Sequence, residues 1–496
     1  MSVGLFEAAE LGQQVSRQDY EARIAKLRVE LINAQFDLRA ADYSVVVLLD
    51  GSDRTAINAV LRGMHDWMDG RALEGHAYGP PSEEERERPL VWRYWDRLPR
   101  NGRIGVFVDG WALEGIRLRV LDEIDEVQYE RWIDAVARFE QELADAGTQF
   151  VKLWFHVPKR ILKKRIAEKR RGSKKAWQLP AAAERLFRGY AAAMKTAERM
   201  LRETSTGAAP WTVIESADQR HAELKAAETI AAALQRRLAR RATAAAPEPA
   251  APLRARDPGE KRVLDVLDLS SKITPEEYHE RLLDLQAEVA RLSAKAARKG
   301  VTSILAFEGW DAAGKGGAIR RITAAIEPRI LRVYGIAAPT EEERAHHYLW
   351  RFWNRIPRDG GVAIFDRSWY GRVLVERVEG FAREDEWRRA YAEIRGFESD
   401  LAQHGCLVQK FWLHIDADEQ LRRFEARKDT PYKQYKLTDE DYRNREKWPD
   451  YAEAVHEMVS RTHTEDAPWH LVPATDKRFA RIQVLEAFCS GLASRL

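Results

Sequence analysis

The feature that most constrains the fold of this 496-residue chain is an internal repeat. The segment WRYWDRLPRNG, which begins at Trp92, returns as WRFWNRIPRDG at Trp350, 258 residues later. The same spacing aligns SEEER with TEEER, LWFHV with FWLHI, and two segments that read APW. Four matches at one spacing indicate that two copies of one domain are fused in tandem.

The two copies are joined by a stretch that is typical of a solvated linker. Residues 242–260, ATAAAPEPAAPLRARDPGE, are rich in alanine and proline and have no apolar periodicity. We therefore expect one domain over residues 1–241 and another over residues 261–496. The second copy begins with a helix signal, because Thr274 precedes Pro275 in the pattern of an N-cap followed by proline at the first helical position.

Short apolar runs alternate with helical patterns in the second copy. The runs expected to be strands are Val301–Gly309, 361–368, 407–415 and Trp469–Thr475, and a helix is expected from Gly316 to Ile326. Such runs suit strands that are buried on both faces of a parallel sheet. Alternating strands and helices imply right-handed βαβ units, so each copy should be a three-layer α/β/α domain with a parallel sheet.

One segment between an expected strand and an expected helix has the pattern of a phosphate-binding loop. Residues 309–316 read GWDAAGKG and match G-x-x-x-x-G-K. The glycines Gly309, Gly314 and Gly316 would let backbone N–H groups turn toward phosphate oxygens, and the helix N-terminus would add partial positive charge. Lys315 would supply a full positive charge. The pattern predicts a domain of the P-loop kinase type.

The loop departs from the usual pattern at one position. The serine or threonine that normally follows the lysine and ligates Mg²⁺ is Gly316 here, and the loop carries a carboxylate, Asp311, instead. Carboxylate oxygens are good ligands for hard divalent cations. We therefore expect Asp311 to hold the metal, directly or through water, or to orient the attacking oxygen.

A second acid is expected at the end of the next strand, where Asp366 and Arg367 follow the apolar run 362–365. Ligands bind beyond the carboxyl ends of parallel strands, so Asp366 should face the same pocket as the loop and serve as the second metal ligand. Arg367 is placed to neutralise charge on phosphate in the transition state. The expected catalytic set is Asp311, Lys315, Asp366 and Arg367.

A basic segment follows the third expected strand. Its positive residues are Arg422, Arg423, Arg427, Lys428, Lys433, Lys436, Arg443, Arg445 and Lys447. In kinases of this architecture a helical lid at this place closes over the phosphates and excludes water. A charge run is more often a solvated helix face, but the position favours a lid, and we expect Arg427, Lys433 and Lys436 to bind phosphate.

Further arginines and histidines follow the loop, at Arg320, Arg321, Arg329, Arg332, Arg344, His346, His347, Arg351, Arg355 and Arg358. A nucleotide pair needs only a few positive groups, so this density favours a long polyanion, either nucleic acid or polyphosphate. The aromatic and zinc signatures of nucleic-acid recognition are missing from the sequence, which favours polyphosphate.

Together these motifs resemble the type-2 polyphosphate kinase family. The resemblance is carried by EGWDAAGKGGAI from Glu308, YLWRFWNRIPRDG from Tyr348, FDRSWYGRVLVERVEG from Phe365 and ARKDTPYKQYKLTDEDYRNREKW from Ala426. It covers nearly all of residues 272–496. It implies a fold similar to thymidylate kinase with a helical lid, and Mg²⁺-dependent phosphoryl transfer between inorganic polyphosphate and a nucleotide. Tandem members resemble the class that makes ADP from AMP and polyphosphate.

The resemblance also carries over to single residues. Asp311, Lys315, Asp366 and Arg367 match the essential loop and second-acid positions of the family, and Lys433 and Lys436 match its lid.

The first copy lacks this chemistry. Its loop reads DGSDRTAI from Asp50 and has no Gly-Lys pair, and the position of Asp366 and Arg367 is taken by Val108 and Asp109. We expect no phosphoryl transfer there, and a structural role or the anchoring of distant polyphosphate through basic residues such as Lys174 and Lys175. In the anchoring hypothesis, neutralising these two lysines raises the KM for long chains only.

Three other functions fit parts of the sequence. An ATP-dependent nucleoside monophosphate kinase shares the fold and loop, although Gly316, Asp311 and the excess of arginines argue against it, and a polyphosphate:ADP phosphotransferase differs only in acceptor. A polyanion-binding scaffold without catalysis is disfavoured by the intact loop. The sequence leaves the acceptor base, the net direction and the formation of homo-oligomers open.

Composition limits the partners and the cellular compartment that we expect for the protein. The formal net charge is +3, so nothing in the overall charge favours nucleic acid or a membrane surface as a partner. Cys406 and Cys489 form no disulfide or metal pattern and suit a reducing compartment. We find no signal-peptide pattern and no apolar stretch of membrane-spanning length, and therefore expect a cytoplasmic protein.

Overall fold

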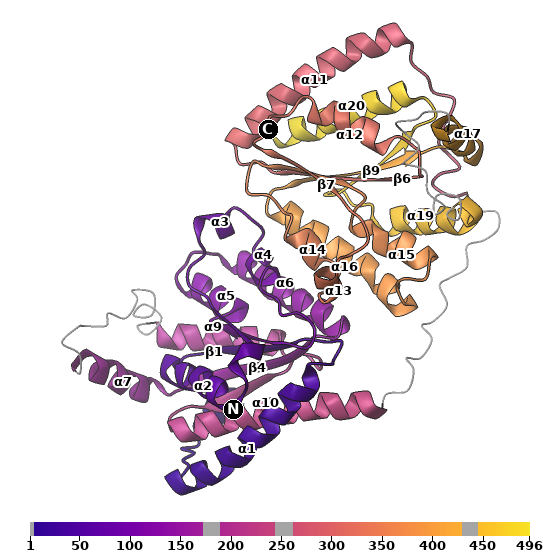
Figure 1. Cartoon of the computed structure of the whole chain (residues 1–496). Coiled ribbons are helices and arrows are strands. Elements are labelled where there is room, and N and C mark those ends of the chain that lie inside the picture. Colours follow the sequence, from indigo (N-terminus) through magenta and orange to yellow (C-terminus); the bar gives the residue numbers. More distant parts are fainter. Residues whose placement is uncertain (1–3, 172–188, 244–260, 429–444) are drawn as a thin grey trace. The chain divides into compact units, whose positions relative to one another are not determined.

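A computed structural model describes residues 4–171, 189–243, 261–428 and 445–496 (Figure 1). The chain forms two compact units. One comprises Met1–Pro81, Arg93–Pro247 and Glu341–His347, and the other comprises Ser82–Trp92, Glu248–Thr340 and Tyr348–Leu496. Most of the expected linker, residues 244–260, lies outside the described residues, and the domain boundaries given above stay a prediction.

The described residues of the first unit contain a five-stranded sheet in the order β2-β3-β1-β4-β5. All neighbouring strands run parallel. The strands are β1 (Val45–Gly51), β2 (Leu73–Ala77), β3 (Ile104–Val108), β4 (Gln149–His156) and β5 (Trp211–Glu215).

The sheet of the second unit has the same order, β7-β8-β6-β9-β10, and is also fully parallel. Its strands are β6 (Ser303–Gly309), β7 (Leu331–Gly335), β8 (Val362–Asp366), β9 (Leu407–His414) and β10 (Trp469–Pro473). Two copies of one parallel sheet confirm the tandem repeat and the predicted α/β class.

Helices cover both faces of the second sheet (Figure 1). One layer holds α11 (Pro275–Arg298), α12 (Lys315–Thr323) and α20 (Lys477–Arg495), and the other holds the 3₁₀ helix η3 (Trp369–Val373) with α15 (Val375–Val378), α16 (Glu384–Gln403) and α19 (Trp448–Thr462). The predicted cap of α11 is confirmed, because the Thr274 side chain accepts a hydrogen bond from the N–H of Glu277. The other helices described in residues 261–496 are α13 (Glu341–Arg344), α14 (Trp350–Trp353) and α17 (Ala417–Lys428).

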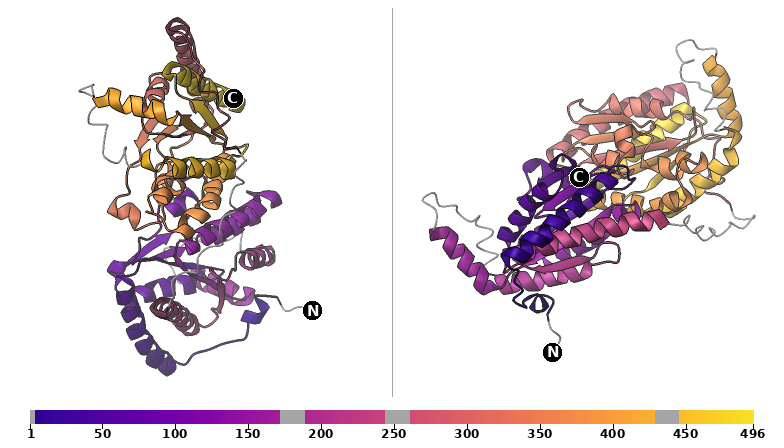
Figure 2. Two further views of the ribbon diagram at one scale, coloured as in Figure 1. Left: turned by 90° about the vertical axis from the view of Figure 1, so that its right-hand side faces the viewer. Right: turned by 60° about the horizontal axis from the view of Figure 1, so that its bottom comes forward.

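The first unit repeats the three layers. Figure 2 shows α1 (Arg17–Leu38) beside α10 (Gln219–Thr243), and α2 (Arg54–Trp67) packs with them. The opposite layer contains α5 (Trp111–Val120), α6 (Glu126–Asp145) and α9 (Tyr190–Glu203). The other helices described in residues 4–243 are η1 (Glu7–Ala9), η2 (Gly70–Ala72), α3 (Glu83–Arg86), α4 (Trp92–Trp95) and α7 (Lys159–Arg171).

The predicted strands and helix of the second copy all occur, with ends that differ by a few residues. Of the strands of the second copy, the sequence patterns missed β7. It lies at a sheet edge and has only half-buried and exposed residues, with Val333 46% exposed. Such a strand has no continuous apolar run to reveal it.

Both copies keep a buried ion pair beneath the sheet. The Lys410 ammonium lies 2.7 Å from the Glu398 carboxylate and donates to the carbonyl of Thr462. Lys152 makes the same two contacts with Glu140 and Thr204, at 2.6 and 2.7 Å. Because both copies have this pair, although only the second has the Gly-Lys motif, we assign it to the fold.

Two further expectations concern the surroundings of the protein. Cys406 and Cys489 are buried, unpaired thiols, as expected. Among the described residues, no helix combines the length and the apolar character that a bilayer crossing needs.

Candidate active site

The phosphate loop and the second acid lie side by side because their strands are neighbours. β6 pairs with β8 so that Phe307 is level with Asp366. The loop leaves β6 after Gly309 and enters α12 at Lys315, and Asp366 ends β8 at the same edge of the sheet. The parallel sheet thus brings together the two segments that the sequence singled out.

Arg367 turns back toward the loop. Its backbone has a φ of +64°, in the left-handed region that non-glycine residues rarely adopt, and its N–H donates to the carbonyl of Phe307 at 3.0 Å. The guanidinium Nη2 lies 3.0 Å from Asp311 Oδ1 and is about half exposed. This arrangement presents a cation to any anion that enters the loop.

The side chain of Lys315 folds back over the loop. Its Nζ donates to the carbonyl of Gly309 at 2.7 Å and to that of Trp310 at 3.3 Å. Burial lowers the pKa of Lys315, and the carboxylates of Asp311 and Asp366 oppose this lowering. Both predicted metal ligands therefore lie near the loop lysine.

Two carboxylates fit a divalent cation that keeps several waters and binds substrate phosphates as well. In the described ranges, no group of three or more His, Cys, Asp or Glu side chains could hold a metal by itself. A metal at Asp311 and Asp366 would thus need oxygen ligands from elsewhere, and the phosphates of a bound substrate would supply them.

Glu308 is a residue whose role the sequence did not reveal. Its buried carboxylate accepts hydrogen bonds from the N–H and the hydroxyl of Ser368, at 2.8 and 2.7 Å. Burial raises the pKa of Glu308, and the Ser368 hydroxyl, Lys315 and Arg367 oppose this rise. Glu308 thereby fixes the segment that carries Asp366 and Arg367 to the start of the loop.

Trp310, the second residue of the loop, packs against an aromatic residue at the start of α19. Its ring and that of Trp448 are stacked, with centroids 3.6 Å apart and planes 9° from parallel. Its indole nitrogen donates to His414 Nδ1 at 3.0 Å, and Trp412 Nε1 lies 3.4 Å from the same atom. The loop is therefore held to β9 and α19 by apolar as well as polar contacts.

The local structure around each of the three loop glycines differs in whether it requires a glycine. A Cβ at Gly309 would lie 2.5 Å from the carbonyl oxygen of Leu413 on the paired strand. Gly314 has a φ of +116°, which favours glycine, although no atom of the described residues lies within 4 Å of a Cβ there. The described residues leave open space at Gly316 as well, so neither backbone strain nor packing against them requires a glycine at this position.

The expected lid residues are only partly described. Lys433 and Lys436 lie outside the described residues. Arg427 lies near the end of α17, with its guanidinium 5.9 Å from the ring centre of Phe424.

The first copy keeps the turn after the β3 strand but neither its charge nor the length of the loop. Asp109 occupies the position of Arg367 and has nearly the same conformation, with a φ of +53°. It forms an ion pair with Arg54, the first residue of α2, so the turn that carries a base in the second copy carries an acid in the first. Two residues separate β1 from α2, whereas five, 310–314, separate β6 from α12. The loop of the first copy is therefore three residues shorter.

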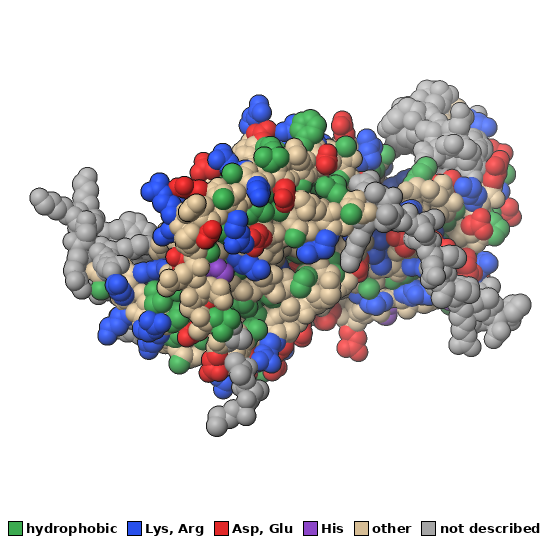
Figure 3. Space-filling model, turned by 90° about the horizontal axis from the view of Figure 1, so that it is seen from below, with side chains coloured by type: hydrophobic (Ala, Val, Ile, Leu, Met, Phe, Trp, Pro, Cys, Tyr) green, Lys and Arg blue, Asp and Glu red, His purple; other side chains and the backbone are tan. Residues whose placement is uncertain are grey.

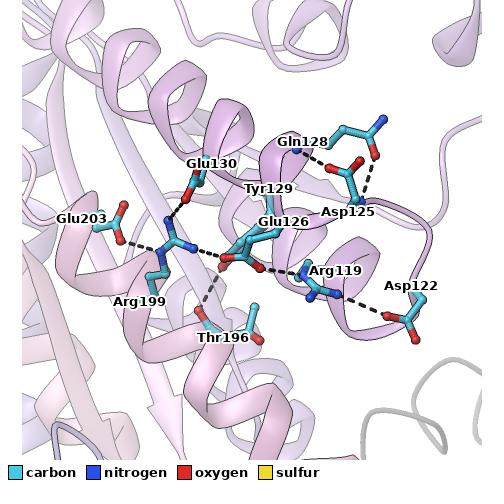
Figure 4. A network of polar contacts seen from close by, with 10 residues as sticks. All are labelled: Arg119, Asp122, Asp125, Glu126, Gln128, Tyr129, Glu130, Thr196, Arg199 and Glu203. Carbon is cyan, nitrogen blue, oxygen red and sulfur yellow. Dashed lines mark hydrogen bonds and ion pairs between the residues drawn. The ribbon is translucent and has the colours of Figure 1, made fainter.

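The helix that follows the basic segment is anchored differently in the two copies. In the first copy Arg199 of α9 contacts Glu126 and Glu130 of α6 (Figure 4). In the second copy the start of α19 is held at Glu379, which accepts from the Lys447 ammonium at 2.7 Å and from the Tyr451 hydroxyl at 3.2 Å. Of these two sets of contacts, only the one around Glu379 lies next to a phosphate loop.

Comparison with known proteins agrees with the tandem arrangement. The family model described as Polyphosphate kinase 2 (PPK2) matches residues 14–242 and again residues 272–495. A protein of Pseudomonas aeruginosa named Polyphosphate:AMP phosphotransferase is 44% identical, with 97% of each chain covered. Its namesake from Pseudomonas syringae pv. tomato is 42% identical, with 98% of each covered.

A solved structure from Pseudomonas aeruginosa that carries the name polyphosphate kinase 2 has the same fold over both copies. It superposes with a TM-score of 0.87 at 42% identity and covers 99% of each chain. The family model, the full-length relatives and the solved structure agree, and the chain belongs to the polyphosphate kinase 2 family.

Proposed function

We propose that the C-terminal copy transfers the terminal phosphoryl group of inorganic polyphosphate to AMP and forms ADP. The observation that carries this proposal is the likeness to relatives named Polyphosphate:AMP phosphotransferase, which extends over 97% of the chain and includes both copies. The site supports it, because one intact phosphate loop is accompanied by an acid and an arginine from the neighbouring strand.

In the proposed reaction an oxygen of the AMP phosphate attacks the terminal phosphorus of polyphosphate in line with the bridging oxygen. The bond from that phosphorus to the bridging oxygen breaks, so that ADP forms and the polyphosphate leaves one unit shorter. The AMP phosphate is already anionic, so the attack needs no strong general base. Positioning and electrostatic stabilisation supply most of the rate.

The residues have distinct tasks in this proposal. Loop amides and Lys315 bind the terminal phosphates, and Arg367 offsets the charge that spreads over the transferred group. Asp311 and Asp366 would hold Mg²⁺. The metal would neutralise phosphate charge and orient the reacting groups. Arg427, Lys433 and Lys436 would bind phosphates further along the chain.

The first copy is proposed to be inactive, because it lacks the loop lysine and places Asp109 where the second copy has Arg367. We place the enzyme in the cytoplasm, where its two buried thiols stay reduced. Its proposed partners are polyphosphate, AMP and ADP, and neither nucleic acid nor a membrane. Basic and acidic side chains are mixed over the face shown in Figure 3, which is therefore not uniformly basic. We expect local clusters of positive charge to bind the polyphosphate.

Donor preference tests the proposal. Purified protein is incubated with AMP and Mg²⁺ and with either polyphosphate or ATP, and ADP formation is followed. Transfer from polyphosphate is expected. Transfer from ATP alone would identify a nucleoside monophosphate kinase, and replacing AMP with ADP as acceptor tests the polyphosphate:ADP alternative.

The variant Lys315→Ala separates an enzyme from a scaffold. We expect it to fold and to lose about three orders of magnitude in turnover, because the loop cation is in direct reach of the phosphates. Arg54→Ala in the first copy is the control and should keep the wild-type rate. Full activity of Lys315→Ala would overturn the assignment of the site.

A further inference from the structure

Side chains hold the carbonyl groups of five consecutive residues in the phosphate loop. Lys315 donates to those of Gly309 and Trp310. The carbonyl of Asp311 accepts from Gln420 Nε2 at 3.3 Å. Those of Ala312 and Ala313 both accept from Arg423 Nη1 at 2.9 Å.

Gln420 and Arg423 are one turn apart on α17 and are almost fully buried, with 2% and 4% of their surface exposed. Arg423 also donates to the carbonyls of Ala474 and Thr475, at 2.7 and 3.0 Å, just after β10. Burial lowers the pKa of Arg423, and Glu419 opposes this lowering. The guanidinium thus links the end of the sheet to the loop.

We call the hydrogen bonds from Gln420 and Arg423 to the loop carbonyls the clamp. They affect the direction in which the loop amides point. The N–H and C=O of one peptide group point in opposite directions, so a carbonyl that is held on the α17 side turns the next N–H to the other side. The N–H groups that follow Asp311 and Ala313 belong to Ala312 and Gly314, and within the described residues neither donates to a protein acceptor. Amides arranged in this way form an anion-binding concavity.

The loop backbone needs such support because it is strained. Ala312 has a φ of +65°, in the left-handed region that costs an L-residue about 1 kcal/mol. The two hydrogen bonds that Arg423 donates to the Ala312 and Ala313 carbonyls hold the chain in this conformation.

Comparison with the first copy shows which contacts of the clamp residues are common to both copies and which occur only with the phosphate loop. Arg165, at the position of Arg423, donates to the carbonyls of Ser216 and Ala217, which correspond to those of Ala474 and Thr475. Its remaining partner is the Asp53 carboxylate and not a loop carbonyl. At the position of Gln420 the first copy has Leu162. Among the described residues, only the second copy has α17-type hydrogen bonds to the carbonyls of its loop.

We propose that Gln420 and Arg423 are positioning residues that hold the phosphate loop in the shape that binds the terminal phosphates of polyphosphate. They touch no substrate and act through the carbonyls of Asp311, Ala312 and Ala313. This inference rests on the proposed function, because it assigns the loop to the polyphosphate donor.

The first test is Gln420→Leu, which places the residue of the first copy in the second. The helix accommodates leucine there, and the Gln420 Oε1 that is lost has no hydrogen-bond partner in the described structure. We expect an unchanged thermal midpoint, a KM for polyphosphate raised about tenfold and an unchanged KM for AMP. A polyphosphate KM equal to that of the wild type would overturn the role of Gln420.

The second test compares Arg423→Lys with Arg165→Lys. Each change removes the fork that binds two carbonyls after the last strand, but only Arg423→Lys also releases the phosphate loop. We expect a raised polyphosphate KM in Arg423→Lys alone. If Arg165→Lys raises it equally, the arginine serves only the fold.

Calorimetric titration with inorganic tripolyphosphate provides a readout without turnover. Gln420→Leu should bind it about tenfold more weakly than the wild type, and equal affinity would contradict the clamp. If the wild-type protein transfers nothing from polyphosphate to AMP but binds tripolyphosphate more tightly than Gln420→Leu, the proposed function fails while the clamp stands.

Discussion

Asp311 and Arg367 form an ion pair, with Oδ1 3.0 Å from Nη2, and in the first copy Asp109, at the position of Arg367, pairs with Arg54 at the start of α2. The left-handed backbone at Arg367 and Asp109 is common to both copies. The turn is therefore a property of the fold, and the sign of its charge is what differs between a copy with a phosphate loop and one without.

Exchanging the charges in the second copy should separate folding from catalysis. The double variant Asp311→Arg with Arg367→Asp retains an ion pair of the kind that the first copy tolerates, so its thermal midpoint should stay close to that of the wild type. Its rate of ADP formation should fall about a thousandfold, because an acid replaces the cation that faces the transferred group. The same exchange at Arg54 and Asp109 is the control and should leave the rate unchanged. A double variant that kept its activity would exclude both roles.

Two loop glycines should respond to alanine with opposite effects on stability. Gly314→Ala places an L-residue at a φ of +116° and should cost about 1 kcal/mol of unfolding free energy. Gly316→Ala fills open space inside α12, where alanine is the better helix former, so the stability should be equal or higher. Urea unfolding gives both values. The activity of Gly316→Ala should nevertheless fall, because phosphates are proposed to approach the backbone at this position. Equal losses of stability in the two variants would refute the distinction.

His414 should make the protein less stable in mild acid. Burial lowers its pKa from 6.5 to about 4, and its Nδ1 accepts the Trp310 indole N–H, which requires the neutral ring. The unfolded chain takes up a proton below pH 6.5 whereas the folded chain does not until about pH 4. Stability is therefore lost as the pH falls through this window, by up to about 3 kcal/mol.

The variant His414→Asn checks the origin of this loss. An amide oxygen can still accept the Trp310 N–H but does not titrate, so the stability of the variant should fall less between pH 6.5 and pH 4. Unfolding free energies measured across that range decide the matter. Parallel curves for the two proteins would show that His414 contributes nothing.

Replacing Lys410 alone should destabilise the protein more than replacing both Lys410 and its buried partner Glu398. Lys410→Met leaves a buried carboxylate without its cation and should cost about 3–5 kcal/mol. Adding Glu398→Gln removes the charge but keeps an acceptor for the Trp369 indole and the Tyr370 hydroxyl, so part of the loss should return.

Lys152→Met is the matched change in the first copy, where Glu140 is the partner. Denaturant unfolding followed by circular dichroism measures all three proteins. A loss below about 1 kcal/mol in both single variants would contradict the importance of the pair.

Much of the fold could be predicted because its signals are local. The buried strands β6, β8 and β9 are continuous apolar runs, and the start of α11 is marked by Thr274 and Pro275. The edge strand β7 has no such run and was missed, since an edge strand is specified by its neighbour and not by its own side chains.

The site shows the same division. Asp311, Lys315, Asp366 and Arg367 were predicted from motifs only a few residues long, and β6 and β8 bring these motifs together. Arg423 was grouped by charge with the basic segment, but the structure buries it against the loop and β10. Nothing in the pattern of charges distinguishes a buried arginine from a solvated one.

By itself, the sequence determined that the chain contains one domain twice, that each domain is a parallel α/β fold, and that only the second copy has a phosphate loop with its lysine. These properties follow from repetition, periodicity and short motifs. The tertiary structure alone decided that Glu308 holds the segment of Asp366 and Arg367, and that Gln420 and Arg423 grip a loop about a hundred residues earlier in the chain. Such contacts depend on which strands become neighbours, and a hydrogen bond between distant residues leaves no periodic trace in the sequence.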